Sequence, residues 1–104
     1  MLPDNYAQGG ERLRIVRGVV SQTGQIISGS GFRSRVVAIG QFVVDFTPPF
    51  SAPPAVTAAA DNGALNQYMM VSTGGVTGST AFFRTFGGRI AGSEAFHFVA
   101  IGPR

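Results

Sequence analysis

Short runs of alternating apolar and polar residues predict β-strands along most of this chain. The runs cover residues 12–20, 26–28, 29–38, 41–46, 55–60, 67–73, 80–86 and 95–101. Glycines separate them, and Val, Ile, Phe and Thr dominate them, which favours strands over helices. No helical run long enough for a crossover connection appears between them. We therefore expect an all-β domain, an antiparallel β-sandwich of about six to eight strands.

The segment TPPFSAPP, residues 47–54, interrupts this strand pattern with four of the six prolines of the chain. Proline fixes φ and lacks the amide hydrogen that a sheet requires, so the segment is neither a central strand nor a helix. We expect it to be extended and to carry the chain from one sheet to the other. Phe50, the one large apolar residue between the two Pro pairs, is expected to anchor it in the core.

Several of the predicted strands are apolar on both faces. In AFHFVAI, for example, Phe96 and Phe98 point opposite to His97, Val99 and Ile101. One core covers only one face of a sheet, so we expect a second apolar face to meet copies of the same chain, most simply in a closed homotrimer or a hexamer. The expected interface residues are Met69, Val71, Phe83, His97, Val99 and Ile101. The alternative is a flattened monomeric barrel with shorter strands.

Composition narrows the class of protein further. The 104 residues suffice for one domain, which we place at residues 12–104 after a flexible lead at 1–11. Cysteine is absent, which excludes disulfides and thiolate metal sites, and no apolar run reaches the length of a membrane span. The net charge of +3, carried by scattered arginines without a recognition motif, argues against nucleic acid as a partner.

Three stretches of the chain resemble the H-type lectin domain, a six-stranded sandwich that forms trimers. They are FTPPFSAPPAV, VTGSTAFFRTF and FHFVAIG. GQIISGSGF and IGQFVVDF also resemble modules at the ends of phage tail fibres and bacterial collagen-like proteins. The resemblance covers most of the chain and implies a trimeric sandwich that recognises carbohydrate or a host surface.

The chain departs from that family where its members bind sugar. Phe86 stands where they place a tryptophan, and methionines stand where they place a basic residue, which argues against their N-acetylgalactosamine specificity. Sugar recognition needs an aromatic face and a few fixed polar groups. The candidate carbohydrate-binding residues are Asp61, Asn62, Asn66, Tyr68, Arg84, Phe86 and Arg89. Each also has an ordinary structural role open to it, in a turn or on a sheet face.

Catalytic chemistry finds little support in the sequence. The acids are scattered over different elements, His97 is the one histidine, and the glycine-rich turns precede no helix that would make a phosphate site. We expect no cofactor and no metal. Three functions remain. The first is a trimerising, surface-binding module of a fibre, virion or cell-surface appendage, and for it we expect a location outside the cell or on a virion. The second is a soluble lectin, and the third is an enzyme or nucleic-acid binder.

Overall fold

The computed structural model of the chain describes residues 12–61, 69–87, 90–92 and 94–104. These residues form nine β-strands and no helix. The strands are β1 (Leu13–Val20), β2 (Ile26–Gly29), β3 (Phe32–Ala38), β4 (Gln41–Phe46), β5 (Ala55–Ala60), β6 (Met69–Gly74), β7 (Thr80–Gly87), β8 (Ile90–Ala91) and β9 (Phe96–Pro103). The prediction of an all-β domain is confirmed. The number of strands is higher than expected, in part because β8 has two residues and leaves no alternating pattern.

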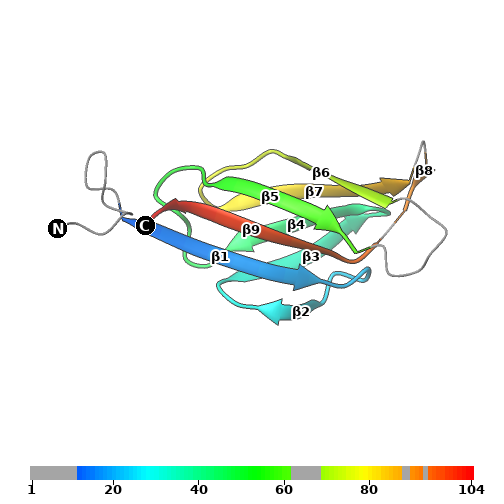
Figure 1. The fold of residues 1–104 in the computed structure, drawn as a ribbon, viewed down its shortest axis with the longest axis horizontal. Coiled ribbons are helices and arrows are strands. Elements are labelled where there is room, and N and C mark those ends of the chain that lie inside the picture. Colours follow the sequence, from blue (N-terminus) through cyan, green and yellow to red (C-terminus); the bar gives the residue numbers. More distant parts are fainter. Residues whose placement is uncertain (1–11, 62–68, 88–89, 93) are drawn as a thin grey trace.

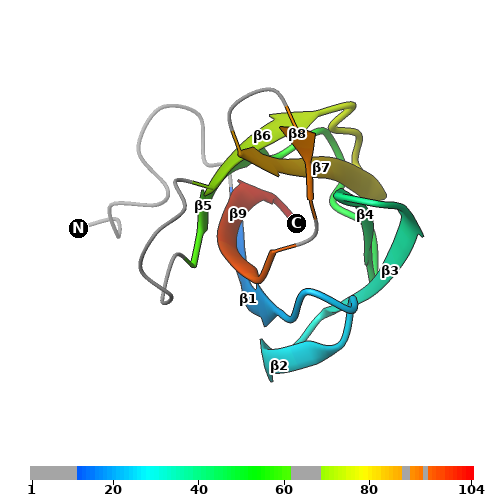
Figure 2. The same ribbon diagram turned by 90° about the vertical axis from the view of Figure 1, so that its right-hand side faces the viewer.

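The strands form two antiparallel sheets that enclose one interior. Sheet A has the order β2-β1-β9-β5, and sheet B has the order β3-β4-β7-β6, with β8 paired to β7. The strands run along the long axis of the molecule (Figure 1), and a view along that axis shows the sheets curled around a common centre (Figure 2). The edge strands β5 and β6 contact each other, as do β2 and β3 less extensively. The sandwich therefore approaches a closed barrel.

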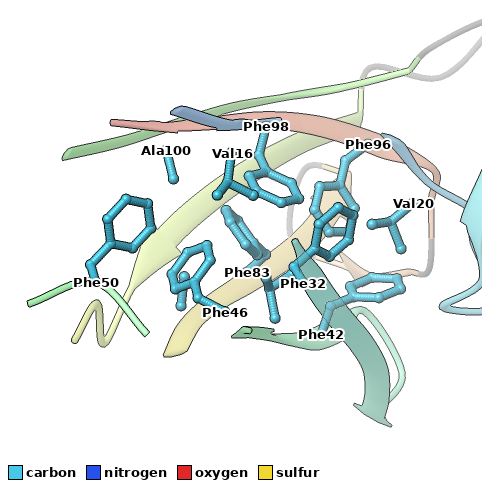
Figure 3. Close-up of a cluster of buried hydrophobic side chains, with 12 residues drawn as sticks. Val16, Val20, Phe32, Phe42, Phe46, Phe50, Phe83, Phe96, Phe98 and Ala100 are labelled. Atoms are coloured by element: carbon cyan, nitrogen blue, oxygen red, sulfur yellow. The ribbon is translucent and has the colours of Figure 1, made fainter. Parts of the chain in front are cut away.

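Phenylalanine rings from both sheets fill the core (Figure 3). Phe83 of sheet B packs against Phe96 and Phe98 of sheet A, with ring centroids 5.0 and 5.4 Å apart. The buried hydrophobic residues are Val16, Val20, Phe32, Phe42, Val44, Phe46, Phe50, Ala81, Phe83, Phe96, Phe98 and Ala100. They alternate with outward-facing residues along β4 and β9, because successive side chains of a strand point to opposite faces.

The proline segment connects the two sheets, as predicted. It follows β4 of sheet B and precedes β5 of sheet A. The Phe50 side chain is 4% exposed, and its ring meets that of Phe46 edge-on with 5.0 Å between centroids. The Phe50 amide donates a hydrogen bond to the Gly78 carbonyl oxygen over 2.8 Å. The crossing is therefore anchored by both the ring and the backbone of Phe50.

Arg14 of β1, in sheet A, also contacts the crossing. Its guanidinium donates to the carbonyl oxygens of Pro48 and Gly31, and its central carbon lies 4.8 Å from the centre of the Phe50 ring. A cation over an aromatic face is attracted by the ring's negative face. The sequence pattern gave Arg14 no specific role, because the guanidinium reaches partners that are distant along the chain.

Two glycines allow the chain to turn tightly between β2 and β3. Gly29 has φ of 102° and Gly31 has φ of 86°, a region that favours glycine. A Cβ atom on Gly29 would also lie 2.2 Å from the Arg17 carbonyl oxygen of the paired strand β1. Both positions therefore suit glycine and would strain another residue.

Candidate recognition surfaces

The outer face of sheet A carries exposed aliphatic side chains at its centre. Ile15 of β1 and its cross-strand partner Ile101 of β9 are 66% and 41% exposed, and Val99 is 38% exposed. We call these three residues the apolar face. The neighbouring edge strand β5 adds only short exposed side chains, which are Ala55, Thr57 and Ala59. The exposed apolar bulk of this face is therefore concentrated on its two central strands.

Three of the six expected interface residues lie on the outer face of β9. His97, Val99 and Ile101 are exposed there, and His97 lies between Val19 of β1 and Ala59 of β5 in the sheet register. Their outward orientation is confirmed, whereas their contact with other copies of the chain stays a prediction. The side chain of Met69 lies outside the described residues.

The other two expected interface residues point inward, and their assignment was wrong. Phe83 is fully buried among core rings, and Val71 is half-buried and packs against the same core. The register explains both positions, because Val71 lies opposite the buried Thr85 and Phe83 lies opposite the buried Phe42. TAFFRTF is aromatic on both faces, so its sequence alone does not say which face turns inward.

β7 presents a second candidate surface on the outside of sheet B. Its residues Phe82, Arg84 and Phe86 alternate with the buried side chains of this strand and therefore point outward. Ser72 of β6 and Gln41 of β4 flank Arg84 on the two sides. We call these five residues the β7 surface. It contains two of the predicted carbohydrate-binding residues, Arg84 and Phe86, together with Phe82, which the sequence analysis had not selected.

Of the remaining predicted sugar-binding residues, the structure describes Asp61. Asp61 is exposed at the end of β5, and its amide donates to the Ala95 carbonyl oxygen over 2.8 Å. The end of β7 lies at this same end of the molecule (Figure 1). The other predicted residues, which are Asn62, Asn66, Tyr68 and Arg89, lie outside the described residues.

Thr85 holds the chain after β7 against the core. It is fully buried, and its hydroxyl donates to the Gly92 carbonyl oxygen over 2.5 Å. Its amide donates to the Gly40 carbonyl oxygen over 2.8 Å. These bonds tie the β3–β4 turn and the segment before β9 to β7. Thr85, which precedes Phe86 in the lectin-like motif, thus has a structural role.

The described residues offer no arrangement suited to metal binding. They contain no group of three or more His, Asp or Glu side chains that could hold an ion, and none of their buried side-chain polar atoms lacks a hydrogen-bond partner. A shallow hollow, lined in part by Arg33 and Ser34, is open to solvent. The Ser34 hydroxyl there donates to the Gly24 carbonyl oxygen. Across the same described ranges, no helix is long and apolar enough to cross a lipid bilayer.

A scan of known family models, a search of curated proteins and a search of solved structures each found no match to this chain.

Proposed function

We propose that the chain is a non-enzymatic, self-associating β-sandwich that serves as a structural and surface-recognition module of a fibre, virion or cell-surface appendage. The observation that carries the proposal is the apolar face, where three aliphatic side chains stand exposed on the two central strands of sheet A. In the proposed homotrimer, each copy covers this face against its neighbours around one axis. The lectin-like and fibre-like sequence stretches support the same assembly.

The size of the apolar face bears on the strength of the assembly. Fully burying a Val or Ile side chain contributes about 1.5–3 kcal/mol. The side chains of Ile15, Val99 and Ile101 are 38–66% exposed, so covering all three would contribute about 3 kcal/mol per copy. Association costs about 4 kcal/mol or more for each copy that is added, so burial of these three side chains does not drive it alone and further contacts have to contribute. The short side chains of β5 would add to this by letting backbones approach closely.

Sedimentation velocity on charge variants tests this assignment. Val99→Lys adds a second positive charge opposite Arg17, its cross-strand partner on the outer face, and should yield a monomer at concentrations where the unmodified chain is a trimer. The matched control is Val37→Lys, which introduces the same charge at an exposed valine of β3 in the other sheet. Equal effects of the two substitutions, or no effect of Val99→Lys, would contradict the proposed interface.

A soluble lectin-like carbohydrate-binding protein is the second candidate function. It is favoured by the β7 surface, where two predicted sugar-binding residues share one outward face. Catalysis is not proposed, because no observation on the described residues favours it. Asp45 pairs with Arg35 over 3.3 Å on sheet B, and the backbone of Ala95 bonds both the Glu94 side chain and the Asp61 amide at the end of β5.

A further inference from the structure

Two aromatic rings flank one guanidinium on the β7 surface. Phe82, Arg84 and Phe86 occupy alternate positions of a single strand, so the rise per residue places the two Phe Cα atoms about 13 Å apart. Both phenylalanines are partly exposed on this outer face. These residues belong to β7, which lies between β4 and β6 in sheet B. Because a strand inside a sheet is rigid, their spacing is fixed.

The space and the polar groups beside these rings suit an extended ligand. Gly74 lies opposite Phe82 on β6, and a Cβ atom added there would meet nothing within 4 Å, so the space at this position beside Phe82 is open. The Ser72 hydroxyl and the Gln41 amide flank Arg84. They supply neutral donors and acceptors next to a charged donor.

The charge of Arg84 is uncompensated within the described part of the chain. Arg84 has no hydrogen-bond or ion-pair partner there, whereas Arg35, on the same outer face, is paired with Asp45 over 3.3 Å. Asp45 itself lies opposite Thr80, two positions of β7 before Phe82. The guanidinium therefore attracts an anion, and its planar fork matches a carboxylate with two parallel hydrogen bonds.

We propose that the β7 surface binds an acidic glycan. A carboxylated sugar, such as a uronate, binds Arg84, and the C–H faces of neighbouring sugar rings pack on Phe82 and Phe86. Gln41 and Ser72 hydrogen-bond the sugar hydroxyls. A nucleic-acid strand fits less well, because binding along a phosphate backbone needs a row of cations, and this surface has one unpaired arginine.

This inference deepens the surface-recognition role proposed above and rests on it. The apolar face lies on sheet A and the β7 surface on sheet B, so the two point away from each other across the core (Figure 2). A trimer closed through its apolar faces leaves three β7 surfaces exposed. Weak sites on linked copies then act together on one polymeric glycan, which raises the overall affinity.

Isothermal titration calorimetry of the full chain with tetragalacturonate tests the site. We expect binding in the millimolar range or tighter, with weak or absent binding of the neutral maltotetraose. Arg84→Gln should weaken binding of tetragalacturonate about tenfold or more, as expected when a charged hydrogen bond is lost. Phe86→Leu, which keeps an apolar side chain but removes the ring, should weaken it several-fold.

Arg33→Gln is the matched control, since it removes the same charge from β3 of the same sheet. Equal losses from Arg33→Gln and Arg84→Gln would reduce the binding to general electrostatics and overturn the site. The site would also be overturned if tetragalacturonate did not bind or if maltotetraose bound equally well. It would be overturned as well if oligothymidylate bound more tightly than tetragalacturonate and depended on Arg84. The monomeric Val99→Lys variant should keep its affinity per site for tetragalacturonate. If the unmodified chain binds tetragalacturonate but forms no trimer, only the proposed assembly is refuted. If it forms a trimer but does not bind tetragalacturonate, only the glycan site is refuted.

Discussion

Phe50→Ala tests whether the proline crossing is held in place by one side chain. The Phe50 ring is buried, meets Phe46 edge-on and lies beneath the guanidinium of Arg14. A Cβ atom on Gly102 would lie 3.0 Å from this ring, which shows that β9 packs closely against it. Truncation to alanine therefore removes contacts to β1, β4 and β9 at once.

The expected cost follows from these contacts. Truncating a buried phenylalanine costs about 3–5 kcal/mol through lost burial and the cavity that remains. The prolines on either side restrict how far the crossing can collapse into that cavity. The edge-to-face ring pair and the cation above the ring each add about 0.5–1 kcal/mol. We therefore expect a loss in the upper part of that range, about 4–5 kcal/mol.

Urea unfolding followed by circular dichroism measures this loss, at several protein concentrations because self-association would add to the apparent stability. The matched control is Phe82→Ala, which truncates the same residue type on the outer face of β7 and should cost about 1 kcal/mol. A loss below about 1 kcal/mol for Phe50→Ala, or equal losses for the two variants, would show that the crossing is not anchored through Phe50.

Two further substitutions test side-chain hydrogen bonds to the backbone, each by the same unfolding assay. Thr85→Val keeps the shape of the buried side chain but leaves the partly buried Gly92 carbonyl without its hydroxyl donor, so it should cost about 1 kcal/mol. A neutral effect would contradict this bond. Arg14→Met keeps much of the apolar stem and removes the guanidinium from the crossing, so it should cost about 1–2 kcal/mol. If Arg14→Lys keeps full stability, a positive charge alone holds the crossing and the hydrogen bonds of the guanidinium are not needed.

The sequence predicted the strands and the crossing because both depend on local patterns. Strict alternation in QFVVDF identified the core residues Phe42, Val44 and Phe46, which have polar or smaller neighbours on the other face. The prolines marked the change of sheet by removing hydrogen-bond donors. Phe50 was identified as an anchor because it was the one large apolar residue within that segment.

Strands that are apolar on both faces were harder to orient. In TAFFRTF, Phe82 and Phe83 are equally apolar, and only the pairing with β4 places Phe83 on the core side with Phe42. Val71 was misassigned for the same reason, because its inward face is set by the pairing of β6 with β7. The role of Arg14 was missed because it bonds carbonyl groups far away in the sequence.

The proposed recognition site was predicted only in part. Arg84 and Phe86 were selected through the lectin-like motif, which placed them near a sugar without saying which sheet face they occupy. Their grouping with Phe82, Gln41 and Ser72 follows from the register of three strands. The alternation within single strands does not predict how neighbouring strands are paired, so it does not predict that register.

The native mass of the unmodified chain, measured by light scattering over a wide concentration range, tests the central claim most directly. We expect the mass to rise with concentration from that of one 10.8 kDa chain to a plateau at three chains. A mass that stays at one chain up to about 1 mM would contradict it, because the net free energy of association would then be less favourable than about −4 kcal/mol.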